Sequence, residues 1–282
     1  MRKKLKIYLT ISLFILGSCS IAGSWVYERA DGYLAEYFKE YANFSEEQKN
    51  EIDKVTESYV NWFTLNELPI IKTILVNMKD INNNNAESLI NEAYLNGQGL
   101  FERSNKYFEK SFVEFSKTLT DLQVDEIKNH FDEIQIEREE SRKKEKSYSE
   151  EMFENFSSGF RRLNIKLTNA QKDFAKENIK ELKNTRPGWS FFQEKWVEEL
   201  IEILKKRNDK DFEKNITSHL RSFENLGDEE FQLKRKNNEQ VTIKIISGIF
   251  SSASEKQIKG MNRRIETYIA SIDRILSNRS LD

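Results

Sequence analysis

Few residues in this sequence have the types and spacing that catalysis or metal binding requires. There are two histidines, His130 and His219, and one cysteine, Cys19. Glu126 and His130 are four residues apart, so on a helix they would share a face and could contribute to one metal site, although a surface ion pair is the simpler interpretation. Neither histidine has the spacing of a zinc or di-iron motif. We therefore expect no metal and no cofactor.

The sequence also lacks the familiar motifs of catalysis and nucleotide binding. The sequence has no Gly-x-Ser-x-Gly turn, phosphate-binding loop or glycine-rich dinucleotide-binding turn. Carboxylates are numerous, but no pair is singled out as a general acid and base. The 45 basic and 47 acidic residues nearly cancel, which excludes the basic excess typical of a nucleic-acid-binding protein. We expect a protein that is not an enzyme and binds no nucleic acid, with an envelope hydrolase as the weaker alternative.

Cys19 stands at the end of a segment that has the order of a signal peptide. Residues 2–6 are mostly basic and residues 7–16 are mostly apolar. The string Leu16-Gly17-Ser18-Cys19 resembles the lipobox of bacterial lipoproteins, which implies cleavage between Ser18 and Cys19 and acylation of the thiol. Two or three acyl chains hold a protein on a membrane where one does not. The alternative is an uncleaved anchor helix over residues 7–26, which its small residues weaken.

The lipobox resemblance also implies a location and a domain order. Ser20 follows the cysteine, and in Gram-negative lipoproteins a residue other than Asp there implies the outer membrane. We expect the periplasm-facing inner leaflet of the outer membrane, with an inner-membrane anchor as the alternative. The expected domains are a signal peptide (1–18), a lipidated tether (19–24) and a helical domain (25–282).

Composition and apolar spacing predict an all-α fold. The chain is 33% charged and 12% aromatic and has only two prolines, Pro69 and Pro187, which favours long helices over a β-fold rich in turns. Apolar residues recur every three or four positions in many segments, most regularly across residues 258–275. We expect an elongated bundle of many helices with antiparallel packing.

Several positions are expected to interrupt these helices. Residues 82–85, all asparagine, predict a loop, Pro187-Gly188 predicts a turn, and Gly97 and Gly99 predict a break. Residues 137–151 are almost wholly charged, with acid–base pairs four residues apart, which is typical of a solvated helix extension. The helical domain is predicted as one unit, with two lobes meeting near residues 137–151 as the alternative.

One local pattern occurs four times: an apolar residue, Ser or Thr, two further residues, and Gln. This is a capping box, in which the hydroxyl accepts from one orphan amide of the helix start and the Gln side chain accepts from another. Spacings of 75, 48 and 86 residues exclude a strict repeat period. The pairs are Ser45 and Gln48, Thr120 and Gln123, Thr168 and Gln171, and Ser254 and Gln257. The plain interpretation is helix initiation, but the pattern also resembles helix starts of periplasmic chaperones of the Spy and CpxP kind, which implies a holdase as an alternative function.

A longer resemblance covers residues 16–75. Its motifs are the lipobox, the segment from Phe44 to Gln48, and Trp62 followed by Glu67-Leu68-Pro69. They resemble an uncharacterised family of proteobacterial lipoproteins that has a Trp-His-Arg-x-x-Glu-Leu-Pro-like segment. Phe63 and Thr64 stand where that family has His-Arg, so no role of that pair is carried over. The resemblance implies location and fold and brings no activity with it.

The segment from Trp62 to Pro69 is the predicted contact surface, made by Trp62, Glu67, Leu68 and Pro69. The plain alternative is a corner between two helices, with Glu67 favoured near the positive end of a helix that Pro69 opens. Aromatic residues at helical spacing are likewise expected to pack in the core, with a ligand groove as the less favoured interpretation. Together with the leader, these features predict a non-catalytic binding or structural component of the envelope, held on the membrane by acyl chains and partnered by another envelope protein.

Overall fold

The computed structural model describes residues 27–143 and 147–279, and all regular structure in these two ranges is helical. The elements are α3 (Ala30–Lys39), α4 (Glu46–Asn66), α5 (Leu68–Met78), α6 (Ala86–Lys117), α7 (Asp121–Lys143), α8 (Tyr148–Arg162), α9 (Asn169–Ile179), α10 (Arg186–Lys205), α11 (Phe212–Ser222), the 3₁₀ turn η1 (Phe223–Asn225), α12 (Glu229–Ser251) and α13 (Glu255–Arg279). The all-α prediction is therefore confirmed. The predicted leader and tether, with Ser18 and Cys19, lie outside the described residues.

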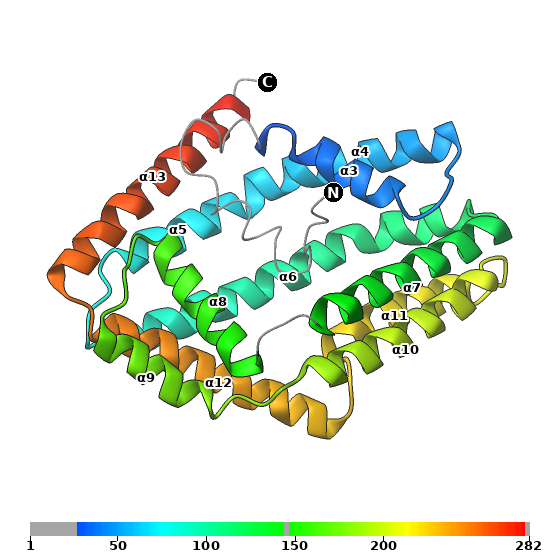
Figure 1. Ribbon diagram of the computed structural model, residues 1–282. Helices are drawn as coiled ribbons and strands as arrows, with labels where there is room; N and C mark the ends of the chain where they lie inside the picture. Colours follow the sequence, from blue (N-terminus) through cyan, green and yellow to red (C-terminus); the bar gives the residue numbers. More distant parts are fainter. Residues whose placement is uncertain (1–26, 144–146, 280–282) are drawn as a thin grey trace.

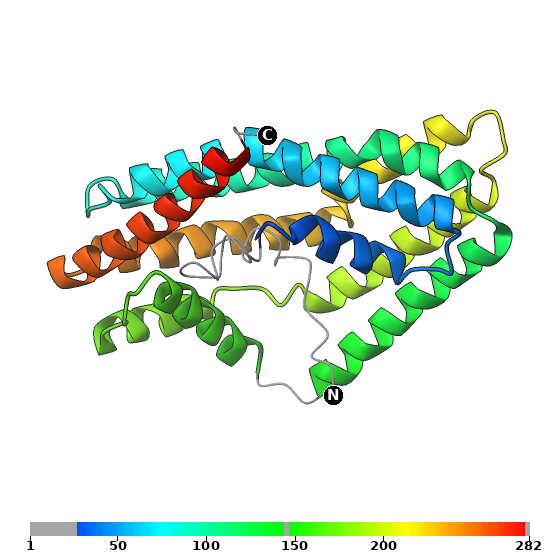
Figure 2. The ribbon, with the colours of Figure 1, turned by 90° about the horizontal axis from the view of Figure 1, so that it is seen from above.

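The helices form an elongated arrangement in which neighbours run in opposite directions. In Figure 1, α6 crosses the middle of the molecule and α12 returns below it, and these two helices pack on each other. The α3–α4 pair covers one side, α7, α10 and α11 gather at one end, and α13 closes the other end. Figure 2, seen from above, shows the same helices spread along one long axis. Among the described helices, none is both long enough and apolar enough to span a bilayer.

Two buried clusters hold the helices together. The larger core joins α4, α5, α6, α8, α9, α12 and α13, and the smaller core joins α3, α4, α6, α7, α10 and α11. Buried residues of the larger core include Val60, Phe63, Leu68, Leu75, Ile165, Leu167, Ala175, Ile179, Ile245, Ile249, Met261, Ile265, Tyr268, Ile272 and Ile275. Those of the smaller core are Ala35, Phe44, Ile52, Val113, Leu119, Val124, Ile127, Val197, Leu200, Ile201, Leu204, Phe212 and Ile216. The regular apolar spacing of α13 thus faces the larger core.

Two predicted interruptions are wrong. Helix α6 runs without a break through Gly97 and Gly99, because an isolated glycine weakens a helix by only about 1 kcal/mol, which tertiary packing readily offsets. Pro187-Gly188 lies within the first turn of α10 and not in a turn between helices. Proline suits this place because the amides of a helix's first turn have no carbonyl partner within the helix, so the amide hydrogen that proline lacks is not missed. The predicted loop at residues 82–85 does lie between α5 and α6.

The charged middle of the chain contains a helix start that sequence reasoning missed. Helix α7 continues to Lys143, as the predicted helix extension requires, and α8 begins after Ser147. The Ser147 hydroxyl accepts from the Glu150 amide, and the Glu150 carboxylate accepts from the Ser147 amide at 2.9 Å. This is a fifth capping box, with Glu in place of Gln.

Candidate functional site

The junction between α4 and α5 is a local break in an otherwise continuous helical path. Glu67 is the one residue between the two helices, and it keeps helical angles of φ −99° and ψ −37°. Its amide donates to the Phe63 carbonyl and its carbonyl accepts from the Ile71 amide, both at 2.9 Å. Pro69 has no amide hydrogen to donate one turn back, so α4 ends here and α5 starts with a proline in its first turn.

The junction buries a carboxylate and pairs it with an arginine from α6. The Glu67 side chain is only 1% exposed, and Arg103 donates to both of its oxygens, from Nε and Nη2, each at 2.7 Å. A buried carboxylate is costly unless it is paired, and a two-pronged guanidinium contact is the strongest common partner. The hydrogen bonds with Glu67 raise the pKa of Arg103 above its ordinary value. Arg103 keeps 42% of its side chain exposed, so the pair reaches the surface.

Gly99 explains how Arg103 can lie back along α6. A Cβ on Gly99 would stand 2.8 Å from Nη1 of Arg103, which is closer than such contacts allow. The glycine is one turn before the arginine on the same helix face. Its missing side chain therefore leaves room for the guanidinium that pairs with Glu67.

A cluster of aromatic rings packs between α4 and α6 near this ion pair. The rings of Trp62 and Tyr107 are 5.0 Å apart between centroids, and those of Tyr59 and Phe108 are 4.4 Å apart. The Tyr59 hydroxyl donates to Ser104 Oγ at 3.0 Å. Burial raises the pKa of Tyr59, so its hydroxyl stays protonated over the ordinary pH range. The cluster fixes the α4–α6 crossing and keeps Trp62 and Tyr107 half-buried at its edge.

The four residues of the predicted contact surface have different positions. Trp62 is half-buried and Pro69 is exposed, but Glu67 and Leu68 are fully buried. Leu68 is part of the larger core and contributes no surface. Sequence reasoning missed Arg103. Its partly exposed guanidinium is the charged group at the surface of this junction, where Glu67 is buried.

Tyr27 attaches the start of the described chain to the same helix. Its hydroxyl is 2.8 Å from Thr64 Oγ1, which in turn donates to the Val60 carbonyl at 2.6 Å. Burial raises the pKa of Tyr27 to about 12, against a partial lowering by the Thr64 hydrogen bond. Thr64 is thus fully buried here.

The first two glutamine capping boxes meet each other. The Gln48 and Gln123 side-chain amides are paired in both directions, at 3.1 and 2.7 Å. Gln48 Nε2 also donates to the Thr118 carbonyl at 3.1 Å and lies 3.2 Å from the Thr118 hydroxyl. Gln123 Nε2 donates to the Asn43 carbonyl at 3.1 Å. These residues are called the first pole, and they join the starts of α4 and α7.

The other two glutamine boxes meet in the same way. Gln171 and Gln257 are paired in both directions, at 3.4 and 2.9 Å. Gln171 Nε2 also contacts the Ser252 carbonyl at 3.4 Å and the Ser252 hydroxyl at 3.3 Å. Gln257 Nε2 donates to the Lys166 carbonyl at 2.9 Å. These residues are called the second pole, and they join the starts of α9 and α13.

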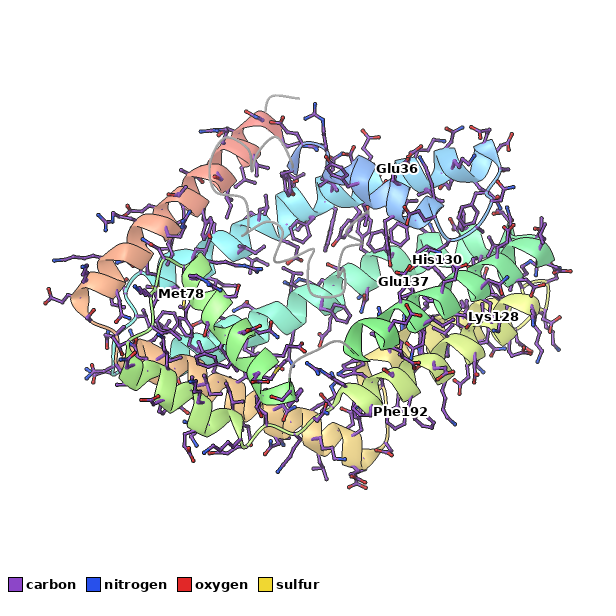
Figure 3. The ribbon with its side chains drawn as sticks, in the orientation of Figure 1. Glu36, Met78, Lys128, His130, Glu137 and Phe192 are labelled. Carbon is purple, nitrogen blue, oxygen red and sulfur yellow. The ribbon has the colours of Figure 1, made fainter. Side chains whose placement is uncertain are left out.

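The histidines make structural contacts. His219 stacks on Trp196 with ring centroids 4.6 Å apart, and its Nε2 is 2.9 Å from the Trp196 carbonyl oxygen. Burial lowers the pKa of His219, so the neutral ring is favoured. His130, labelled on α7 in Figure 3, packs its ring at a tilt against that of Tyr41, with centroids 4.4 Å apart. Glu126, its predicted partner, accepts a hydrogen bond from the Asn43 amide at 2.8 Å. In residues 27–143 and 147–279, no group of metal-binding side chains comes together.

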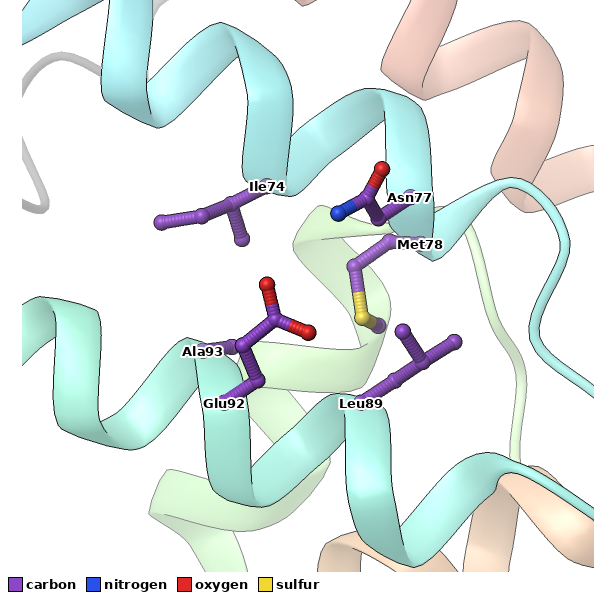
Figure 4. A pocket seen from close by; sticks show the side chains of 6 residues that line it. All are labelled: Ile74, Asn77, Met78, Leu89, Glu92 and Ala93. Carbon is purple, nitrogen blue, oxygen red and sulfur yellow. The ribbon is translucent and has the colours of Figure 1, made fainter.

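A small cavity lies between α5 and α6, well away from the ion pair. It measures about 10 Å³, which holds at most one water molecule. Figure 4 shows the side chains around it. They are Ile74, Asn77, Met78, Leu89, Glu92 and Ala93.

Comparison with known families places the chain. Residues 40–232 match the family of unknown function DUF6279, and since this is more than half of the chain, the protein belongs to that family. The match includes the α4–α5 junction with Arg103, the whole first pole and the Gln171 box. The comparisons with curated proteins and with solved structures found no match.

Proposed function

We propose that the protein is a non-catalytic lipoprotein of the cell envelope that acts as a binding or structural scaffold. The observation that carries this proposal is the string Leu16-Gly17-Ser18-Cys19 after a basic and then apolar leader. Acylation of Cys19 would hold the helical domain at a membrane surface without a spanning helix. The proposed location is the periplasmic face of the outer membrane, with the inner membrane as the alternative.

The α4–α5 junction is the proposed contact surface for another envelope protein. Trp62 and Tyr107 present rigid aromatic edges, and Arg103 is oriented by two hydrogen bonds to Glu67. Tryptophan, tyrosine and arginine are the residue types that most often dominate binding energy at protein interfaces. A surface held in place before binding also loses less side-chain entropy when a partner docks.

Site-specific photo-crosslinking in intact cells tests this assignment. Leu65 is one turn from Trp62 on α4 and is 61% exposed, and Leu233 on α12 is equally exposed and serves as the matched control. A photoreactive residue at position 65 should give a discrete crosslinked band that position 233 does not give. Loss of that band in the Arg103→Ala variant would assign the contact to the junction. Equal crosslinking at both positions, or none at position 65, would contradict the proposal.

The second candidate is a holdase chaperone of the envelope. Its support is the set of Ser/Thr-x-x-Gln helix starts, together with exposed large apolar side chains such as Leu65, Leu95, Leu122 and Leu233. Exposed apolar groups beside charges suit the transient binding of unfolded chains. The test is light scattering of a reduced, aggregating model protein. A holdase should suppress scattering at an equimolar ratio, and unchanged scattering would exclude this function.

A further inference from the structure

The two poles share one pattern of hydrogen bonds. In each, the first glutamine of the pair contacts the carbonyl and the hydroxyl of the residue two positions before the second N-cap, which is Thr118 in one pole and Ser252 in the other. In each, the second glutamine donates to the carbonyl two positions before the first N-cap. Two unrelated helix junctions have no reason to agree in partner, order and direction.

The helices between the boxes follow the same order in both parts of the chain. A helix precedes the first box in each part, α3 before α4 and α8 before α9, and it packs on the box helix that follows. The next helix starts with a proline in its first turn, Pro69 in α5 and Pro187 in α10. Long helices, α6 and α12, then lead to the second boxes and to α7 and α13. The chain's two prolines thus occupy equivalent places.

The last helix of each part packs on the other part. Helix α7 packs on α10, where Arg138 donates to Gln193 at 2.8 Å. Helix α13 packs on α5, where Lys72 pairs with Asp273 at 2.5 Å. The two cores show the same exchange. Helices α10 and α11, from the second part, contribute to the smaller core beside the first pole, and α5, from the first part, contributes to the larger core beside the second pole. The equivalent helices α6 and α12 pack on each other and run in opposite directions, as a two-fold axis perpendicular to both requires (Figure 1).

The chain ends fit the same symmetry. Asn278, near the end of α13, donates to Glu28, just before α3, at 3.4 Å. The equivalent step within the chain leads from the end of α7 to the start of α8 and spans only the few residues between Lys143 and Tyr148. The last helix of each part therefore ends where the first helix of the other part begins.

We propose that the chain is a tandem duplication of one helical unit, residues 30–143 and 148–279, folded as a single-chain pseudo-dimer whose two units exchange their last helices. Four observations support this duplication: the matching hydrogen bonds of the two poles, the common order of helices, the exchanged contacts and the adjoining ends.

The duplication also marks Glu67–Arg103 as a specialised feature of the first unit. Arg103 precedes Gln123 by as many residues as Asn237 precedes Gln257. In the second unit, Asn237 donates to the Glu181 carbonyl at 3.1 Å, and Asn238 binds both backbone groups of Lys183 at 2.7 Å. Two neutral amides and the exposed ion pair between Lys244 and Glu181 thus hold the link between α9 and α10 to α12, so the second unit has no buried carboxylate in the role of Glu67.

A circular permutant tests the pseudo-dimer. The full helical domain is reordered to start at Ser147 and end at Lys143, with a short flexible linker joining Arg279 to Tyr27. Because the new connection is equivalent to the old one, the permutant should keep the parent's helical circular dichroism and a single cooperative unfolding transition within a few degrees of the parent's. A permutant that is helical but unfolds in two separate transitions would overturn the proposal.

Double-mutant cycles on the unpermuted protein provide an independent measurement if the permutant fails to fold. Gln→Ala changes at positions 48 and 123 should lower the unfolding midpoint less together than the sum of the two single changes, and positions 171 and 257 should show the same coupling. The pair 48 and 171, one from each pole, should be additive. Coupling in only one pole would overturn the equivalence of the two units.

Discussion

Glu67 and Arg103 form a two-pronged ion pair between the α4–α5 junction and α6. Because Glu67 is fully buried, its charge depends on Arg103 for compensation, whereas Arg103 can turn to solvent if Glu67 is lost. The two partners are therefore not equivalent in their contribution to stability. Removal of the arginine strands a charge in the interior, and removal of the carboxylate does not.

We expect the Arg103→Ala variant to lose about 2–4 kcal/mol of unfolding free energy, somewhat less than for a fully buried pair because Arg103 is partly exposed. The Glu67→Gln/Arg103→Ala double variant should recover part of that loss, since no charge is then buried. Urea unfolding of the wild type, the single variants and the double variant measures these values. A double variant less stable than Arg103→Ala alone would show that the charge on Glu67 is not the cause.

Tyr27 should make stability sensitive to alkaline pH. Its pKa is raised to about 12 in the folded chain, against an ordinary value of 10.0, so between these pH values the unfolded chain loses a proton that the folded chain keeps. The free energy of unfolding should therefore fall as pH rises through this window, by up to about 3 kcal/mol from this residue. The Tyr27→Phe variant should lose that part of the slope while it keeps contributions from other tyrosines. Parallel pH profiles for the two proteins would contradict the assignment.

At the residue scale, sequence reasoning found one partner of the site but not the other. Trp62, Glu67 and Pro69 stand together in a distinctive segment, so they could be singled out. Arg103 is 36 residues from Glu67 and lies among many other charges, and only the packing of α6 on α4 brings the two together. A buried acid at a helix junction requires a cation, but a single sequence does not indicate which one.

At the scale of elements, the capping boxes were the most informative local signal. Each of the four predicted Ser/Thr-x-x-Gln segments starts a helix with both of its reciprocal bonds in place. A box uses only atoms within four consecutive residues, so sequence alone specifies it. The pairing of boxes across the fold depends on packing and could not be read from the sequence. The glycine signals were less informative, because the same residue can end a helix or make room within one.

Two glycines should respond to alanine in opposite ways. Gly227, before α12, has φ +103°, and a Cβ there would lie 2.3 Å from Phe231, so Gly227→Ala should cost at least about 1–2 kcal/mol of backbone strain. Gly97 lies inside α6 with no atom near its Cβ position, so Gly97→Ala should stabilise by about 0.5–1 kcal/mol. Thermal unfolding of both variants checks this. A stabilised Gly227→Ala protein would mean that the joint before α12 adopts another backbone conformation in solution.

At the scale of the whole molecule, the helical class followed from composition and spacing, but the arrangement did not. The spacings between successive boxes are unequal, which hid the relation between residues 30–143 and 148–279. The difference arises because α5 in the first unit corresponds to α10 and α11 in the second, which changes the length of chain between boxes. The hydrogen bonds of the two poles show the correspondence between the two units, which differences in segment length hide in the sequence.

The function rests on whether this scaffold is tethered by its only cysteine. Intact-mass and peptide mass spectrometry of the protein isolated from membranes measures this directly. We expect a mature chain that begins at Cys19, with the thiol carrying a diacylglyceryl group, and a Cys19→Ser variant that is neither acylated nor cleaved there. Mature protein that retains Met1 and a free Cys19 thiol would contradict the proposed tether and with it the envelope scaffold.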